Sequence, residues 1–175
     1  PFVFASRHGE TTRTLALLGD IADEQPLSPT QFGLSVHNAI AGQWSILRGQ
    51  RGESTAIAGE ADTFEHAMLE GALQLLAGAP AALVVIAEER PPPAYAQWIE
   101  DVPFSYAVAL RLGRVAPSGA APEGTVWRLE HAREAGDCAR CAWPHALDFL
   151  RAHINRDSSL KHTWKTRRWN WQHLG

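Results

Sequence analysis

Cysteine is scarce in this sequence, and it has no long hydrophobic run. The only two cysteines, Cys138 and Cys141, are too few and too close together for a disulfide framework. We therefore expect a reducing compartment, with the cytoplasm as the default. The longest apolar block, Ala79 to Ala87, has the length of a strand and not of a membrane span. The opening residues lack the basic region and apolar run of a secretory signal. Because they also lack Met, the sequence indicates a trimmed or incomplete N-terminus, and it leaves open whether the native N-terminus is longer.

Charge of one sign does not dominate either. The chain of 175 residues has a formal net charge of −3, with 45% hydrophobic and 20% charged residues. This composition is typical of one globular domain, or of part of a larger fold that a partner completes. The charge is unevenly spread, because residues 151–175 contain six of the 16 Lys and Arg but one of the 19 Asp and Glu. That tail carries about +5 and the remainder about −8.

Apolar patterns in the first half of the chain predict an α/β fold. The continuous run from Ala81 to Ala87 is typical of a strand that is covered on both faces. A strand, a helix and a second strand in this order predict a βαβ unit. The expected strands are Phe2 to Ser6, Ser54 to Ala58 and Ala81 to Ala87, and the expected helices are Thr12 to Ala22, one helix from a cap at Thr30 to Gly49, and Ala61 to Leu76.

The second half of the sequence predicts a smaller addition to this core. Phe104 to Leu112 and Thr125 to His131 are separated by a loop rich in Gly and Pro, which indicates an antiparallel hairpin. Pro144 to Ile154 predicts a helix. Leu160 to Trp171 alternates bulky and basic residues, as an edge strand would.

Arg7-His8-Gly9-Glu10-Thr11 follows the first expected strand. The segment resembles the start of the histidine phosphatase family, which implies that His8 takes up a phosphoryl group while Arg7 holds its oxygens. That family also needs a second His, a further Glu and another Arg, which we do not find in recognisable contexts. Hydrolysis of a phosphoester is therefore an alternative function.

Four potential soft metal ligands lie close together in the sequence: His131, Cys138, Cys141 and His145. Thiolate and imidazole are the ligands of a tetrahedral zinc site, so a zinc-containing interaction module is a second alternative. The competing interpretation is a pair of loop cysteines beside two ordinary surface histidines. Because only one CxxC pair is present, we assign no metal and no cofactor.

The C-terminal tail interleaves basic and aromatic residues. Such a pattern can bind single-stranded nucleic acid, but it also suits an edge strand with tryptophans packed on the core and basic side chains in water. We favour packing, expect no nucleic acid partner, and leave the basic side chains available to an acidic protein. The residues concerned are Lys161, Lys165, Arg167 and Arg168, with Trp164, Trp169 and Trp171 between them.

A longer stretch carries a family resemblance. The order SPTQF, HNAIAGQWSI and, after a Gly-rich break, STAIAGEADTFEHAMLEGALQLLAGAPAALVVIAEE resembles the first half of a β-ketoacyl synthase. It is similar above all to the β-ketoacyl synthase N-terminal-like, or chain-length factor-like, proteins of aryl-polyene and related lipid gene clusters. The resemblance covers about residues 2 to 90, and Trp169-Asn170-Trp171 is similar to the end of those proteins. It implies about half of a thiolase-like fold, with a mixed sheet flanked by helices.

The resemblance also implies a missing nucleophile. In active synthases a Cys at the turn between strand and helix attacks an acyl thioester. Thr55-Ala56-Ile57-Ala58 occupies that place here, so Ile57 stands where the nucleophile should be. Glu60 is expected to satisfy the dipole at the start of the next helix. His37 and Asn38 are expected on the preceding helix, to hold this turn or to face a partner.

From the resemblance we expect one domain over residues 1–175, with the core at 1–90 and a hairpin, a helix and a Trp-rich strand at 91–175. It implies a subunit that is not an enzyme by itself and that pairs with a complete β-ketoacyl synthase, through elements around residues 30–60. The pair would act in fatty-acid or aryl-polyene biosynthesis. An acyl carrier protein is the expected acidic partner of the tail, through Lys161, Lys165, Arg167 and Arg168. The sequence leaves open whether the chain forms a homodimer when alone.

Overall fold

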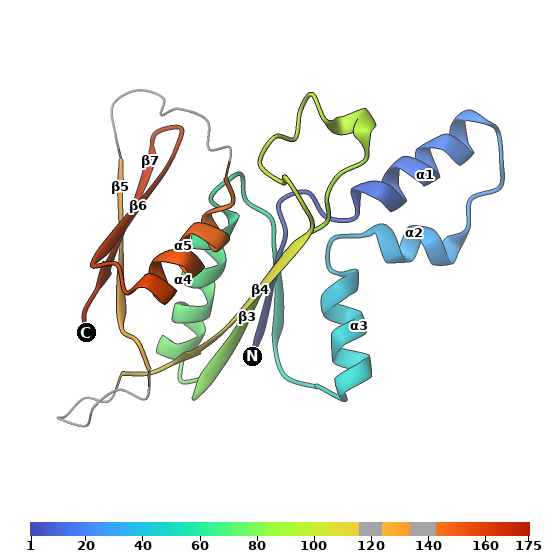
Figure 1. Cartoon of the computed structure of the whole chain (residues 1–175). Coiled ribbons are helices and arrows are strands. Elements are labelled where there is room, and N and C mark those ends of the chain that lie inside the picture. Colours follow the sequence, from blue (N-terminus) through green and yellow to red (C-terminus); the bar gives the residue numbers. More distant parts are fainter. Residues whose placement is uncertain (116–123, 134–142) are drawn as a thin grey trace.

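The computed structural model describes residues 1–115, 124–133 and 143–175. Within these residues the strands form two sheets, and α4 and α5 lie between them (Figure 1). Along the chain the elements are β1 (Phe2–Ala5), α1 (Thr11–Ala22), α2 (Pro29–Ser35), α3 (Ala39–Arg48), β2 (Ser54–Ile57), α4 (Thr63–Leu76), β3 (Ala81–Glu88), the short 3-10 helix Pro93–Tyr95, β4 (Tyr106–Gly113), β5 (Trp127–Arg133), α5 (His145–Asn155), β6 (Ser159–Trp164) and β7 (Arg167–His173).

The first sheet is mixed and has the strand order β2-β1-β3-β4. β1 lies between β2 and β3 and is parallel to both, while β4 is antiparallel to β3. All four residues of β1 are buried. Along β3 buried residues alternate with half-buried ones, so this strand is more covered on one face than on the other. The prediction of a mixed sheet flanked by helices is confirmed.

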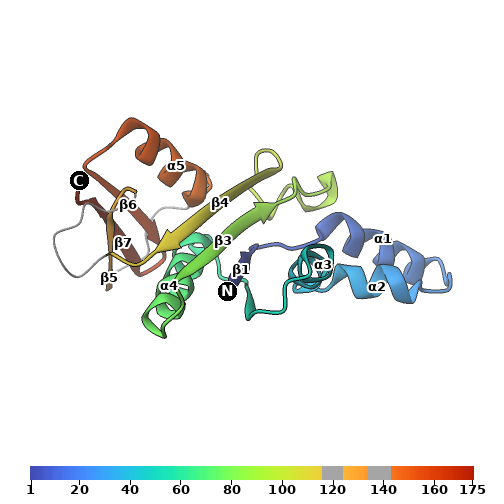
Figure 2. The same cartoon turned by 90° about the horizontal axis from the view of Figure 1, so that it is seen from below.

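Alternate residues of β1 pack on opposite layers, because neighbouring strand residues point to opposite faces. Val3 and Ala5 belong to the main core, with Phe64 of α4, while Phe2 and Phe4 pack on α3. Helices α1, α2 and α3 therefore lie on the other side of the sheet from α4, and Figure 2 shows them extending away from it.

α4 is enclosed from both sides. One face packs on the first sheet, where Gly71 allows a close approach to Val84 and Leu112. The other face meets α5 and the second sheet, with Phe64 stacked on Trp171 at 5.5 Å between ring centroids. α4 is therefore buried on more than one side.

The helix predicted from Thr30 to Gly49 is two helices instead. Val36 has an extended backbone, with φ −72° and ψ 144°, and it ends α2. The break allows the imidazole Nε2 of His37 to contact the backbone oxygen of Ser6, at 2.8 Å, just beyond β1. The N-terminal cap of α2 is Ser28 and not Thr30, because the Ser28 hydroxyl accepts the backbone N–H of Gln31 and proline follows it at the first helical position.

The predicted hairpin between residues 104 and 131 is wrong. β4 pairs with β3 over its whole length, and β5 pairs with β7 in the second sheet. The second sheet is antiparallel, with the order β5-β7-β6. The expected edge strand from Leu160 to Trp171 is a hairpin, which turns where Lys165 has a positive φ of 51°, and its second strand is the central one. Trp169 and Trp171 are buried, Trp169 against Asp62 and His66 and Trp171 against Phe64 and Phe149.

In the described part of the chain, no helix combines the length and the apolar content that a membrane span requires.

Candidate functional site

The connection between β2 and α4 is where the family resemblance places the nucleophile. Ile57 is the last residue of β2 and packs against the main core. α4 begins six residues later, at Thr63, two residues after the predicted helix start at Ala61. The Thr63 hydroxyl donates to the backbone oxygen of Glu60 at 2.7 Å and accepts the N–H of Gly59 at 3.0 Å. Residues 57–62 contain no thiol and no hydroxyl, so none of their side chains can form an acyl ester.

The two carboxylates in this connection bind the C-terminal hairpin. Asp62, which is fully buried, accepts two hydrogen bonds from Arg167, at 2.6 and 2.9 Å, and one from the indole N–H of Trp169, at 2.9 Å. Glu60 accepts from Arg167 at 2.8 Å and from Lys165. Both carboxylates therefore fix the start of α4 to β7 and its turn. Glu60 lies before the helix and pairs with basic side chains, and its expected role toward the helix dipole stays a prediction.

These contacts set the ionisation of both acids. Hydrogen bonds from Lys165 and Arg167 lower the pKa of Glu60 to about 2. Burial by itself would raise the pKa of Asp62, but the hydrogen bonds from Arg167 and Trp169 outweigh burial and hold that pKa below its ordinary value. Both groups are carboxylates at neutral pH.

The residues predicted to dock a carrier protein differ in how exposed they are. Lys165 and Arg167 contact Glu60 and Asp62 within the chain, although Lys165 keeps 54% of its side chain exposed. Lys161 is exposed on β6, and Arg168 is half-buried on β7. The docking role of this set stays a prediction.

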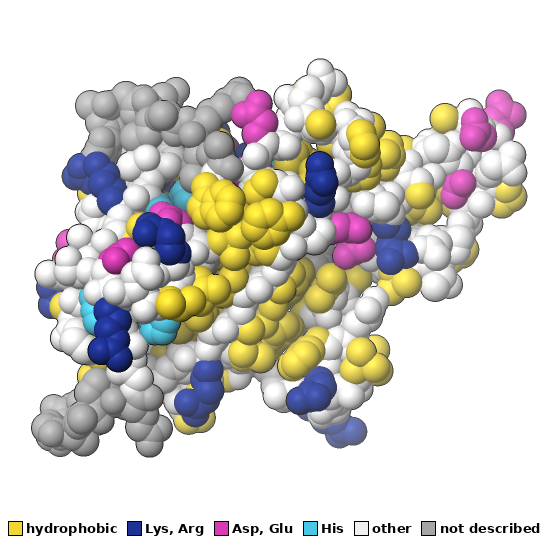
Figure 3. Space-filling model, viewed as in Figure 1, with side chains coloured by type: hydrophobic (Ala, Val, Ile, Leu, Met, Phe, Trp, Pro, Cys, Tyr) yellow, Lys and Arg dark blue, Asp and Glu magenta, His cyan; other side chains and the backbone are white. Residues whose placement is uncertain are grey.

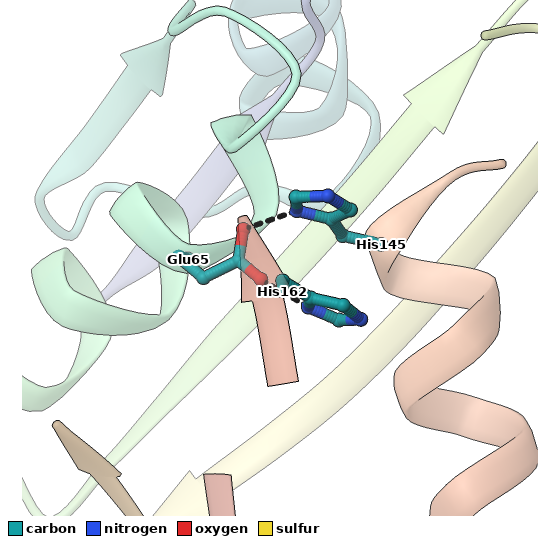
Figure 4. A group of neighbouring side chains, drawn as sticks. All are labelled: Glu65, His145 and His162. Atoms are coloured by element: carbon teal, nitrogen blue, oxygen red, sulfur yellow. Dashed lines mark hydrogen bonds and ion pairs between the residues drawn. The ribbon is translucent and has the colours of Figure 1, made fainter. Parts of the chain in front are cut away.

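A second group of titratable side chains lies deeper, one turn into α4. The carboxylate of Glu65 contacts His145 Nδ1 at 2.9 Å and His162 Nδ1 at 2.5 Å, as Figure 4 shows. All three residues are buried. Burial would raise the pKa of Glu65, but the hydrogen bonds with the two histidines outweigh it and bring the pKa to about 2.

Of this second group, the sequence singled out His145 alone. Glu65 lies 80 residues from His145 and 97 from His162, and no local pattern connects it to them. Of the predicted zinc ligands, His131 is on β5 and packs against Trp169 with ring centroids 4.5 Å apart. Cys138 and Cys141 lie outside the described residues, so the complete set of four stays a prediction.

A carboxylate also contacts Arg7 and His8, in the segment that resembles the histidine phosphatase family. Asp101 accepts from Arg7 Nη1 at 2.7 Å and contacts His8 Nε2 at 3.1 Å. Burial would raise the pKa of Asp101, but the contacts with His8 and Arg7 outweigh it and lower that pKa. An ionised carboxylate between these two side chains would repel a phosphate group. The geometry therefore disfavours the phosphatase alternative.

His37 and Asn38 lie in the break between α2 and α3, not within a helix. His37 faces Ser6 beside a cavity of about 400 Å³, whose wall also includes Glu88 and Tyr106. Glu88 accepts the Ser6 hydroxyl at 3.0 Å, and burial raises the pKa of this carboxyl. Asn38 precedes α3, but its side chain makes no capping hydrogen bond. Whether this pair faces a partner stays a prediction.

Comparison with known proteins identifies the family. Residues 1–172 match the model of the beta-ketoacyl synthase N-terminal domain. One solved structure is that of the ketosynthase ApeO in complex with its chain length factor ApeC from Xenorhabdus doucetiae. A chain of that complex resembles this one with a TM-score of 0.84 at 25% identity, over 98% of this chain and 68% of that chain. No curated protein sequence gives a match. The predicted family and half-thiolase fold are confirmed: the chain belongs to the β-ketoacyl synthase N-terminal domain family.

Proposed function

We propose that this chain is a non-catalytic, ketosynthase-like subunit of the chain-length factor type, which pairs with a complete β-ketoacyl synthase. The observation that carries the proposal is the connection between β2 and α4. This chain belongs to the family, but residues 57–62 of that connection contain no thiol and no hydroxyl. The two acids of the connection, Glu60 and Asp62, bind side chains of the C-terminal hairpin, which are Lys165, Arg167 and Trp169. The synthase would supply the nucleophilic Cys and the histidines of the reaction.

The surface supports a protein partner. Several large apolar side chains of α1, α2 and α3 are exposed, among them Phe32 at 60% and Ile46 and Leu47 at 82% each. Figure 3 shows further hydrophobic side chains gathered over the strands of the first sheet. Exposed apolar surface of this extent marks a contact area more often than a free surface. The resemblance to a chain of a ketosynthase–chain length factor complex favours a ketosynthase as the occupant.

The test is co-expression with a complete β-ketoacyl synthase. We expect a stable complex of defined mass by size-exclusion chromatography with light scattering, no condensation by this chain alone, and a changed product chain length when the pair is compared with the synthase alone. Turnover by the isolated chain, or failure to form a complex with a folded synthase, would contradict the proposal. The same measurement on the chain alone decides between a monomer and a homodimer.

We also propose that the basic C-terminal hairpin contributes to docking of an acyl carrier protein, which is an acidic protein as a class. Reversal of Lys165 or Arg167 would disturb the contacts with Glu60 and Asp62, so the informative change is Lys161→Glu on the exposed side of β6. We expect several-fold weaker carrier binding, with a difference that shrinks as salt rises. The exposed Arg114, outside the hairpin, gives the control Arg114→Glu. Equal binding by both variants would remove the hairpin from the docking surface.

A further inference from the structure

Three buried donor groups converge from three separate elements of the structure. Glu65 comes from the first turns of α4, His145 begins α5, and His162 lies on β6 (Figure 4). One donor atom of each lies within 4.8 Å of the others. The exposed fractions are 0% for Glu65, 3% for His145 and 5% for His162. A polar cluster of this kind is costly to bury and therefore calls for a physical role.

The orientation of the two imidazoles is the first sign of that role. Their rings are stacked, with centroids 4.0 Å apart and planes 12° from parallel. Each ring directs its Nδ1 atom toward a different oxygen of the same carboxylate, at 2.9 Å for His145 and 2.5 Å for His162. The two Nδ1 atoms and the two oxygens of one carboxylate thus lie together in one buried place.

A second carboxylate supports the orientation of His162. Asp148 of α5 places its Oδ2 atom 3.3 Å from His162 Nε2, on the far side of the ring from Glu65. Histidines that bind metals commonly contact a carboxylate through the other ring nitrogen, which fixes the orientation and the tautomer of the ring. His162 has this arrangement, with Nδ1 on the side of Glu65 and His145.

We propose that Glu65, His145 and His162 bind one divalent transition-metal ion, with Zn²⁺ as the best fit, and that Asp148 positions His162. Two imidazole nitrogens and one carboxylate oxygen are a ligand set that zinc uses, whereas Mg²⁺ and Ca²⁺ prefer oxygen ligands throughout. The ion replaces the two protons that the Nδ1 atoms share with Glu65. With bonds of about 2.0–2.1 Å, the ligands of a tetrahedral zinc site lie about 3.3 Å apart. The donor atoms here lie within 4.8 Å of one another, and the stacked imidazole rings need to turn for both Nδ1 atoms to reach one ion.

Such an ion would crosslink distant parts of the chain. Glu65 is 80 residues from His145 and 97 from His162, so the ion joins α4 to α5 and to the second sheet. This site shares His145 with the zinc motif seen in the sequence, but it replaces His131 and both cysteines by Glu65 and His162. Metal binding here is independent of pairing with a synthase, so the two proposals are tested separately.

The experiment uses the full chain, purified without a histidine tag, stripped with a chelator and titrated with Zn²⁺. We expect about one Zn²⁺ per chain by elemental analysis and a higher Tm after loading. His145→Gln and His162→Gln keep a hydrogen-bonding amide beside Glu65 and should lose the ion. Asp148→Asn should weaken binding by about 10–100-fold. The double variant Cys138→Ser/Cys141→Ser is the matched control, and it should bind as the wild type does.

The proposal is overturned if the wild type binds no Zn²⁺. It is also overturned if His162→Gln binds Zn²⁺ as the wild type does, or if the cysteine double variant loses Zn²⁺ binding. Far-UV circular dichroism shows whether each variant is folded. If the histidine variants fail to fold, the wild type loaded with Co²⁺ decides. A tetrahedral visible spectrum without a thiolate charge-transfer band supports ligation by imidazole and carboxylate, and a strong thiolate band contradicts it.

Discussion

Arg167 on β7 forms a two-point ion pair with Asp62 at the start of α4, with Nε–Oδ2 at 2.6 Å and Nη2–Oδ1 at 2.9 Å. The two residues are 105 positions apart, and the Asp62 carboxylate is fully buried. A bidentate contact between a guanidinium and a carboxylate fixes orientation as well as distance. It therefore aligns the second sheet with the start of α4, and it depends on the charge of Asp62.

Loss of that charge should destabilise the fold in a pH-dependent way. The pKa of Asp62 is lower in the folded chain than its ordinary value of 3.8, so the contact stabilises the fold above about pH 4 and is lost as the pH falls through the folded pKa. We expect Asp62→Asn to reduce the free energy of unfolding by up to about 3 kcal/mol at pH 7. The difference from the wild type should shrink as urea unfolding is repeated at lower pH.

Glu60→Gln is the control for this change. Its carboxylate contacts the same Arg167 but is 39% exposed, so solvent screens the interaction and the loss should be smaller. The pKa of Glu60 is about 2 in the folded chain against an ordinary 4.5, so its smaller contribution is complete above about pH 4.5 and is lost as the pH falls toward 2. Equal losses in the two variants would show that burial of Asp62 does not strengthen the contact.

The two buried tryptophans of β7 should respond differently to the same substitution. The indole N–H of Trp169 donates to Asp62 at 2.9 Å, while that of Trp171 finds no acceptor among the described residues. Trp169→Phe should therefore cost about 1.5–3 kcal/mol more than Trp171→Phe, because it removes a hydrogen bond to a charged group. Chemical unfolding of both variants measures the difference. Indistinguishable stabilities would mean that this hydrogen bond contributes little.

Gly71 is the position on α4 where a single methyl group should be harmful. A Cβ atom there would lie 2.8 Å from Leu112 Cδ1 and 2.8 Å from Val84 Cγ2. Gly71→Ala should destabilise the chain by about 1–3 kcal/mol, despite the better helix propensity of Ala. Gly19→Ala on α1 meets nothing within 4 Å and should stabilise by about 0.5–1 kcal/mol. Thermal unfolding should show a lower Tm for Gly71→Ala and a higher Tm for Gly19→Ala. A higher Tm in both variants would mean that α4 lies farther from the sheet than this structure places it.

The exposed apolar end of α3 provides a direct test of the proposed pairing. Ile46 and Leu47 are both 82% exposed, so Ile46→Glu/Leu47→Glu should leave the isolated chain folded while weakening the complex with a synthase at least tenfold. Leu76 at the end of α4 is 81% exposed and lies outside residues 30–60, so Leu76→Glu is the matched control. Titration calorimetry compares the variants. Unchanged affinity in the double variant would exclude this part of α3 from the interface.

The sequence predicted the elements whose residues interact locally. Helix periodicity placed α1 and α4, and β-branched and apolar runs placed β1, β2 and β3, since these patterns reflect burial on nearby layers. The break at Val36 escaped this reasoning, because the apolar spacing continues across it and the contact between His37 and Ser6 is not local. The pairing of β4 and β5 was wrong because adjacency along the chain does not determine which strand offers the better partner.

The candidate site was harder to predict than the fold. Ile57 and Glu60 were singled out by family resemblance, but the salt bridges of Glu60 depend on a hairpin more than 100 residues away. In the sequence, Glu65 is one of 19 acidic residues, and His162 is one residue of the basic and aromatic tail. Only folding brings both to His145. Side chains that meet across such separations leave no spacing for a motif search to detect.

The position of the second sheet has a consequence for synthesis of the protein. Chains are made from the N-terminus, so α4 leaves the ribosome long before His145, His162 and Trp171. During that interval Phe64 lacks its stacking partner Trp171, and Glu65 lacks its contacts with His145 and His162. The nascent chain is then prone to aggregation, and premature termination near residue 140 would leave this surface permanently exposed. Lower growth temperatures and abundant chaperones should accordingly raise the yield of folded protein.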